Sequence, residues 1–202
     1  MKTMGIIAEF NPFHNGHKYL IEKAKKITGA KNAIIVCSGN YVQRGMPAFY
    51  DKSLRTKAAL RNGADVVLEL PCCYATASAE TFAASAVKLL DCLNCVDYLC
   101  FGCETDNIKV LPKIVSILLN EPDDFKNGYS FPKSRAKALT DYCLENNILQ
   151  FDELDNLLNK PNNILAIEYL KAIKRLNSSI KPVAIKRVGA GYNSKKTNTT
   201  FA

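Results

Sequence analysis

The chain has no apolar run long enough to cross a bilayer. Its longest apolar runs, such as Ala33–Cys37 and Val66–Leu68, fall far short of the roughly 20 residues that a spanning helix needs. The first residues, Met1–Gly5, lead straight into a strand-like run and contain no signal-peptide core. We therefore expect a cytoplasmic protein that has no membrane partner.

An arginine-rich tail, a recognised nucleic-acid module, an internal repeat and a low-complexity tract are also missing. The net charge is nevertheless +8 over 202 residues, with a modest concentration of basic residues in Lys171–Lys196. This charge favours a polyanionic partner, although a basic surface without such a partner explains it as well. With 48% hydrophobic and 23% charged residues, the composition is that of one ordinary globular domain over 1–202.

The spacing that is typical of structural zinc is absent, although the chain contains eight cysteines. Cys92 and Cys95 form one CxxC pair, and Cys100 and Cys103 form another only four residues later. Zinc-binding pairs usually stand well over about ten residues apart, so that two turns can converge on one ion. We interpret the cysteines as reduced core residues and expect no protein-bound metal.

Five nearly continuous apolar runs predict strands that helices cover on both faces. Helical patterns separate most of these runs. One of them ends at Gly29, a second covers Asp51–Asn62, and a third repeats over Phe82–Leu93. Alternation of strand and helix predicts an α/β fold, a Rossmann-like doubly wound parallel sheet. The predicted strands are Gly5–Phe10, Ala33–Cys37, Asp65–Leu70, Asp97–Phe101 and Pro182–Val188.

A longer helical stretch, about Asp106–Asn177, separates the fourth predicted strand from the fifth. Val110, Leu111, Ile114 and Leu118 mark one helix in it. A second helix has Pro161 near its start and the apolar positions Leu165, Tyr169, Ala172, Ile173 and Leu176. We interpret the stretch as a helical insertion within the domain.

The turn after the first strand carries Phe13-His14-Asn15-Gly16-His17. Ligands of open parallel sheets bind outside the carboxyl ends of the strands, and the helix that starts here favours an anion. The spacing of His14 and His17 puts both imidazoles on one side of the first helical turn, and Gly16 leaves room for a phosphate. The histidines can then stabilise the charge that builds on an α-phosphoryl group as pyrophosphate leaves.

Two other interpretations of these histidines stay open. They could be metal ligands, although the chain has no third histidine. They could also be polar residues that cap the helix.

The HxGH turn resembles the signature of the nucleotidyltransferase superfamily that includes class I aminoacyl-tRNA synthetases. The longer run from Gly5 to His17 resembles the opening of the tRNA(Met) cytidine acetate ligase family. Further segments agree with that family in order and spacing: Ser38–Gly45, Gly63–Pro71, Phe101–Glu104, Pro161–Tyr169 and Arg187–Ala190.

This resemblance implies an enzyme that uses ATP to activate acetate as acetyl-adenylate, with Mg²⁺ accompanying ATP. The acetyl group would then pass to the exocyclic amine of the wobble cytidine in elongator methionine tRNA. It also implies an ATP site formed by Ile7, Ala8, Glu9, Phe10, Asn11, Pro12, Phe13, His14, Asn15, Gly16, His17, Lys18, Tyr19, Leu20, Gly102, Asn162, Arg187 and Val188. Asn163 is a less certain neighbour.

The residue types outside the first turn suit these roles. Gly102 would leave room for adenine or ribose just past the fourth strand, or is a plain turn glycine. Asn162 can offer a donor and an acceptor to a nucleoside, or can cap the helix that begins there. Arg187 suits a phosphate or carboxylate, or is a solvated surface charge. Arg44 could meet acetate, phosphate or tRNA, and Glu69 has no assigned catalytic role.

Two rival functions share the fold. One is a nucleotidyltransferase that acts on a small phosphorylated metabolite, and the other is a non-catalytic protein that binds nucleotide or RNA.

Members of the resembled family continue past this length with a second signature, a Ser-Ala-x-x-Ile-Arg-like segment, and a C-terminal domain. We therefore expect these 202 residues to fold and to bind adenine nucleotide weakly, but to acetylate tRNA poorly or not at all.

The cysteine interpretation predicts free thiols and no stoichiometric zinc. Elemental analysis of the purified chain and thermal melting with and without a chelator would test it. Structural zinc contributes folding free energy directly, so one zinc per chain or loss of fold on mild chelation would contradict the prediction.

Overall fold

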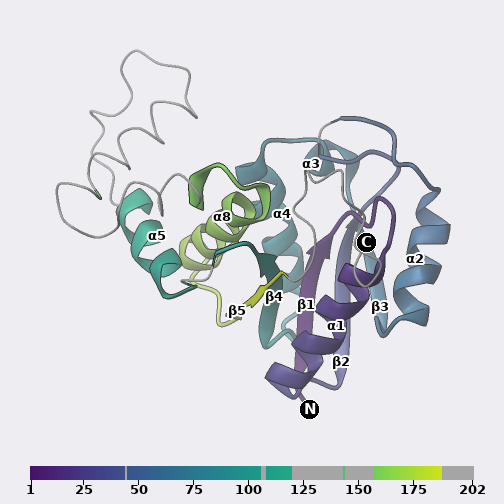
Figure 1. Ribbon diagram of the computed structural model, residues 1–202, viewed down its shortest axis with the longest axis horizontal. Coiled ribbons are helices and arrows are strands. Elements are labelled where there is room, and N and C mark those ends of the chain that lie inside the picture. Colours follow the sequence, from purple (N-terminus) through teal and green to yellow (C-terminus); the bar gives the residue numbers. More distant parts are fainter. Residues whose placement is uncertain (44, 106–107, 120–142, 144–156, 188–202) are drawn as a thin grey trace.

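The computed structural model describes residues 1–43, 45–105, 108–119, 143 and 157–187. Five strands form one parallel sheet in the order β3-β2-β1-β4-β5 (Figure 1). They are β1 (Thr3–Ala8), β2 (Asn32–Ser38), β3 (Val66–Leu70), β4 (Tyr98–Cys103) and β5 (Lys181–Lys186). The predicted Rossmann-like α/β sheet is therefore confirmed. The strand order reverses between β1 and β4, so the switch point lies where these two strands end.

Helices cover both faces of the sheet (Figure 1). α1 (Asn15–Thr28) and α2 (Lys52–Arg61) pack on one face, where Met4, Ile6, Ile21 and Ala59 share a buried core. α4 (Ala79–Cys92) and α8 (Pro161–Arg175) pack on the other face around Phe82, Leu90, Leu99 and Ile167. The remaining described helices are α3 (Cys72–Ala75), η1 (Ile108–Val110) and α5 (Leu111–Leu119), which packs on α8.

The predicted helix boundaries agree with local backbone signals. Gly29 adopts a left-handed φ of 66° and ends α1, and Asp51 caps the first turn of α2 through the backbone N–H of Ser53. Pro161 stands at the first position of α8, where its missing N–H leaves no bond unmade. Leu93, the last member of the predicted apolar stripe, is the exception, because it lies past the end of α4 and is exposed.

Most predicted strand boundaries are off by one or two residues, and the carboxyl ends of β1, β4 and β5 are each off by two. β1 ends at Ala8 rather than Phe10, because Phe10 has a φ of 51° and turns the chain out of the ladder. β5 ends at Lys186, and Val188 lies outside the described residues. β4 continues to Cys103 because it pairs with β5 over its whole length, so Gly102 lies inside the strand.

The stretch between β4 and β5 is described only in part. α8 packs against α4 and β4, so it belongs to the helical layer on the sheet. A buried ion-pair network joins α8 to α4: Lys171, which is 1% exposed, contacts Glu168 at 2.7 Å and Glu80 at 3.3 Å. Most of 120–156 lies outside the described residues, and the predicted insertion stays a prediction there.

A buried arginine joins the ends of β1 and β2. Arg55 of α2 is 2% exposed, and its guanidinium donates to the backbone carbonyls of Glu9 at 2.6 Å, Ser38 at 3.0 Å and Gly39. Its Nε donates to the Tyr50 carbonyl at 3.0 Å. Among the described residues, no carboxylate pairs with it. Arg55 therefore holds three chain segments at the carboxyl edge of the sheet mainly through bonds to backbone carbonyls.

We expect Arg55→Ala to lower the free energy of unfolding by about 3 kcal/mol or more, because it leaves several buried carbonyls without a donor. Urea unfolding would measure the loss. Arg61→Ala is the matched control, since Arg61 lies exposed on the same helix and should change stability by less than about 0.5 kcal/mol. Equal stabilities of the two variants would contradict this role.

Candidate active site

The loop after β1 is tied to the loop after β2. The Glu9 carboxylate accepts from the backbone N–H of Gln43 at 2.6 Å. Asn11 Oδ1 accepts from the backbone N–H of Phe49 at 2.6 Å. These bonds, with those of Arg55, hold the loop that leads into the histidine turn.

His14 and His17 close the first turn of α1 by capping each other's backbone. His14 is the N-cap residue, and its Nδ1 accepts from the backbone N–H of Gly16 at 3.0 Å. His17 Nδ1 accepts from the backbone N–H of His14 at 3.3 Å, which completes a capping box. The rings stack with centroids 3.8 Å apart, so the prediction that both lie on one side of the turn is confirmed. The helix-capping interpretation is also correct.

This capping arrangement determines which ring nitrogen carries the proton. Each Nδ1 accepts a hydrogen bond, so a neutral ring must carry its proton on Nε2. Burial lowers the pKa of His14, and the nearby Arg187 charge lowers it further. Burial, His14 and Arg187 together lower the pKa of His17 to about 3. Both rings are therefore neutral Nε2–H donors at neutral pH.

Aromatic neighbours account for the burial of His17. Phe10 meets its ring edge-on with centroids 5.0 Å apart, and Phe13 lies at 5.6 Å. Sequence reasoning gave Phe10 and Phe13 only as parts of an ATP-binding run, whereas the structure shows them as packing partners of a histidine.

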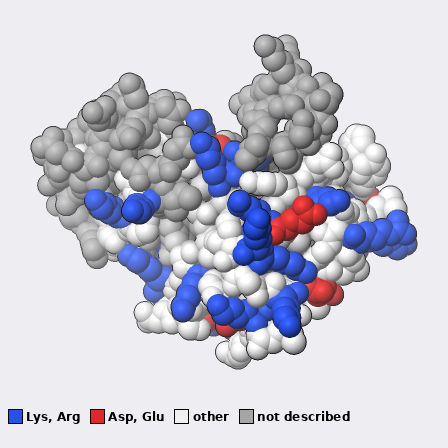
Figure 2. All heavy atoms as spheres, turned by 60° about the horizontal axis from the view of Figure 1, so that its bottom comes forward, with Lys and Arg blue, Asp and Glu red and all other residues white. Residues whose placement is uncertain are grey.

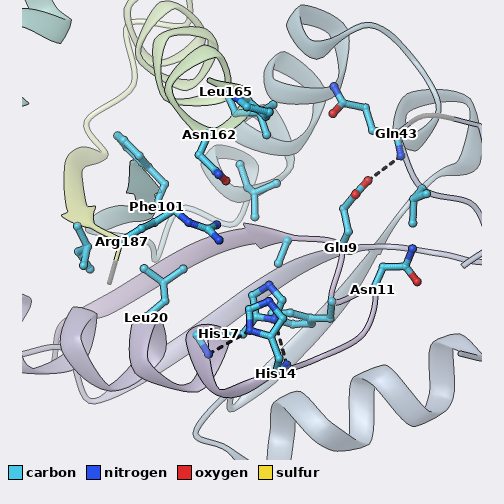
Figure 3. Close-up of a pocket in the computed structure, with 18 of the residues that line it drawn as sticks. Glu9, Asn11, His14, His17, Leu20, Gln43, Phe101, Asn162, Leu165 and Arg187 are labelled. Atoms are coloured by element: carbon cyan, nitrogen blue, oxygen red, sulfur yellow. Dashed lines mark hydrogen bonds between the residues drawn. The ribbon is translucent and has the colours of Figure 1, made fainter. Parts of the chain in front are cut away.

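The histidines face a cleft of about 320 Å³ at the switch point between β1 and β4 (Figure 3). Fourteen of the eighteen predicted ATP-binding residues line it: Ile7, Ala8, Glu9, Phe10, Asn11, Pro12, His14, Gly16, His17, Tyr19, Leu20, Gly102, Asn162 and Arg187. Phe13, Asn15 and Lys18 do not line it, and Val188 lies outside the described residues. Val42, Gln43, Met46, Phe82, Phe101, Pro161, Leu165, Tyr169, Ile185 and Lys186 complete the lining.

The wall opposite the histidines comes from β4, β5 and α8. Gly102 leaves room for Arg187, because a Cβ at Gly102 would lie 3.3 Å from Arg187 Cγ. Both interpretations of Gly102 placed it after the fourth strand. That placement is wrong, because pairing with β5 extends β4 past Gly102. Arg187 follows β5, lines the cleft and points its guanidinium toward it (Figure 3), while the residue as a whole remains exposed.

Asn162 does not cap α8, because Lys160 is the N-cap residue and Asn162 is the second residue of the helix. Its Nδ2 donates to the Glu104 carboxylate at 2.5 Å. Glu104 was assigned no role from the sequence, although an acidic residue directly after a central strand was a usable signal. Asn163, the less certain neighbour, is 1% exposed and does not line the cleft.

Two further residues at this edge were named without a firm role. Glu69 is exposed and forms an ion pair with Lys52 at 2.8 Å. Arg44 lies outside the described residues.

The two CxxC pairs do not converge on one ion. Cys92 and Cys95 are exposed, whereas Cys100 and Cys103 are buried in β4. Residues three apart on a strand point to opposite faces of the sheet, so Cys100 and Cys103 cannot bind the same metal ion. Within the described ranges, no group of three or more His, Cys, Asp or Glu side chains could hold a metal ion.

None of the helices in the described part of the chain combines the length and the apolar character that crossing a membrane requires.

A family model described as HIGH Nucleotidyl Transferase matches residues 1–202. The chain belongs to this family. Curated relatives agree: tRNA(Met) cytidine acetate ligase of Clostridium perfringens is 49% identical over 97% of this chain and 51% of its own length. The ligase of Halothermothrix orenii is 46% identical over 98% of this chain and 50% of its own length. The resemblance to tRNA(Met) cytidine acetate ligases is thereby confirmed.

Solved structures of a family member share the fold. Apo Thermotoga maritima TmcAL has a TM-score of 0.90 and 40% identity, over 98% of this chain and 48% of that one. The same protein bound with alpha-thio ATP has a TM-score of 0.86 and 41% identity, over 94% and 47% of the two chains. The present chain spans about half the length of the curated relatives that it matches.

A neutral His17 in the folded chain makes stability depend on pH. Its pKa falls from 6.5 to about 3 on folding, so between these values only the unfolded chain binds the proton. The stability that neutral His17 contributes is fully present above pH 6.5 and is lost as the pH falls toward 3. The loss is at most about 1.4 kcal/mol per pH unit. His14, whose pKa is also lowered, acts in the same direction.

His17→Gln is the informative variant, because glutamine keeps an acceptor at the same capping position but does not titrate. Urea unfolding at several pH values should show a shallower acid loss in His17→Gln than in the wild type. Identical slopes would show that His17 is protonated in the folded chain.

Proposed function

We propose that this chain is the ATP-binding half of a tRNA(Met) cytidine acetate ligase. The whole ligase would activate acetate with ATP as acetyl-adenylate and pass the acetyl group to N4 of the wobble cytidine in elongator methionine tRNA, and this chain would supply its ATP site. The observation that carries the proposal is the pair of stacked, neutral imidazoles at the start of α1, which face one cleft with Arg187. The ligase relatives and the relative bound to an ATP analogue support it.

In the first step, an acetate oxygen attacks the α-phosphorus, and the bond from the α-phosphorus to the pyrophosphate oxygen breaks. Negative charge builds on the α-phosphoryl oxygens and on the leaving group. The Nε2–H groups of His14 and His17 are fixed by the capping box and can donate to these oxygens without reorganising. The α1 dipole and the Arg187 guanidinium favour the same charge.

In the second step, the cytidine N4 attacks the acetyl carbonyl, the C–N bond forms, and the bond from acetyl to AMP breaks with loss of a proton from the amine. A polyanionic tRNA suits the net charge of +8. Figure 2 shows Lys and Arg side chains spread over the face that comes forward from the bottom of Figure 1, with few acidic ones between them. The basic charge is therefore distributed and not confined to the cleft.

Mg²⁺ would enter with ATP as part of the substrate. Glu9 is the one carboxylate among the described residues that line the cleft, and it already accepts from Gln43. Mg²⁺ is commonly held by one or two carboxylates together with substrate phosphates and water. Glu9 and the phosphates fit that pattern better than an all-protein site does.

The proposal is tested by ATP–pyrophosphate exchange with the purified chain, measured with and without acetate. Exchange that requires acetate is expected, whereas exchange driven by a phosphorylated metabolite supports the first rival function. Labelled acetate, ATP and total tRNA, followed by nucleoside analysis, identify the acceptor. Because these 202 residues are expected to acetylate tRNA poorly or not at all, the same assays are run on a longer version that carries the second signature. Nucleotide binding with no exchange in that version too would favour the non-catalytic rival.

We expect His14→Ala and His17→Ala each to lower the exchange rate by about 10²-fold or more, the usual scale for removing one transition-state donor. Both variants should still fold, with a loss of about 1 kcal/mol from the broken cap. Thermal melting separates the two effects. Lys26→Ala, an exposed change on the same helix, is the control and should exchange like the wild type. Unchanged exchange in the double histidine variant would remove these residues from the mechanism.

A further inference from the structure

Two helix N-termini border the same cleft. α1 begins at Asn15 beside the histidines, and α8 begins at Pro161, which lines the opposite wall together with Asn162. Each terminus has backbone N–H groups without a partner inside the helix and a partial positive charge, so each could attract a phosphate. The two termini differ in what they carry. α1 presents two neutral imidazoles, whereas a carboxylate of the protein itself accepts a backbone hydrogen bond at the start of α8.

That carboxylate belongs to Glu104, in the segment that follows β4. Its Oε1 accepts from Asn162 Nδ2 at 2.5 Å, and its Oε2 accepts from the backbone N–H of Asn163 at 3.0 Å. Asn163 Oδ1 accepts in return from the backbone N–H groups of Glu104 at 2.8 Å and Thr105 at 3.2 Å. Because Asn163 is 1% exposed, this reciprocal set of bonds fixes the start of α8 against the end of β4.

The bond to Glu104 determines how the Asn162 amide is oriented. A carboxylate only accepts hydrogen bonds, so the amide nitrogen must be the atom that faces Glu104. Asn162 lines the cleft, and its amide points there beside the Arg187 guanidinium (Figure 3). With the nitrogen held on Glu104, the amide oxygen Oδ1 is the atom that can accept a hydrogen bond from a bound molecule.

We propose that Glu104 is a positioning residue that determines which end of the cleft takes the nucleoside and which end takes the phosphates. It holds Asn162 so that Oδ1 accepts from a donor group of the nucleoside, and its negative charge keeps phosphates away from the start of α8. The triphosphate is thereby directed to His14, His17 and Arg187. This inference rests on the proposed use of ATP. The nucleoside group that Oδ1 binds would be a hydrogen-bond donor, either the exocyclic amine of adenine or a ribose hydroxyl.

Calorimetric titration with ATP and with inorganic triphosphate tests the inference. Glu104→Gln keeps the side-chain shape but loses the charge and one of the two acceptor oxygens. It should weaken ATP binding by about 10-fold, the scale of one well-placed hydrogen bond. Triphosphate should bind equally well or better, because a negative charge is gone. Ser78→Ala is the stability control, since it removes the N-cap bond of α4 without touching the cleft and should leave both affinities unchanged.

Asn162→Ala and the double variant, which combines Glu104→Gln with Asn162→Ala, show whether Glu104 acts through Asn162. The double variant should bind ATP no more weakly than Asn162→Ala alone, because the two side chains act as one unit. Inosine triphosphate and 2′-deoxy-ATP identify the donor. The analogue that lacks it should bind the wild type about 10-fold more weakly than ATP does, and this difference should vanish in Glu104→Gln.

Three outcomes would overturn the inference. Equal losses of ATP and triphosphate in Glu104→Gln would indicate general damage to the cleft. Unchanged ATP binding in that variant would show that Glu104 does not position the nucleoside, and would leave the proposed function standing. A wild-type chain that binds no ATP would overturn the proposed function along with the inference.

Discussion

Two hydrogen bonds to imidazole Nδ1 atoms set the chemistry of the whole cleft. They use the acceptor nitrogen of His14 and of His17 to close the first turn of α1, which leaves the opposite nitrogen of each ring as a donor. A helix start that was capped by serine or aspartate would be as well formed, yet it would offer no ring N–H to a phosphate. In this chain, the same bonds that begin the helix also prepare the donors.

The neutrality of these donors comes from packing. Phe10 and Phe13 cover part of the His17 ring, and the Arg187 charge disfavours a second positive charge beside it. A cationic pair of histidines would add positive charge that also attracts phosphate in the ground state. Neutral donors leave the fixed charge to Arg187 and confine the histidines to directed hydrogen bonds.

The walls of the cleft are held by contacts that lie outside it. Arg55 binds the loop carbonyls after β1 and β2, and the Lys171 network joins α8 to α4. Glu104 then connects α8 to the end of β4. Because each contact involves a buried or partly buried charge, removing one partner leaves a costly group unsatisfied. These contacts therefore fix the positions of the segments that form the cleft walls.

The sequence by itself determined what depends on near neighbours. Apolar runs indicated the five parallel strands, Gly29 and Pro161 indicated helix ends, and the HxGH spacing placed two imidazoles on one turn. Only the tertiary structure decided the rest. Glu9 and Arg55 are 46 residues apart, and Glu104 and Asn162 are 58 apart. The extension of β4 past Gly102 depends on pairing with β5. Such contacts have no local pattern, because a side chain's partner is set by where the whole chain brings it.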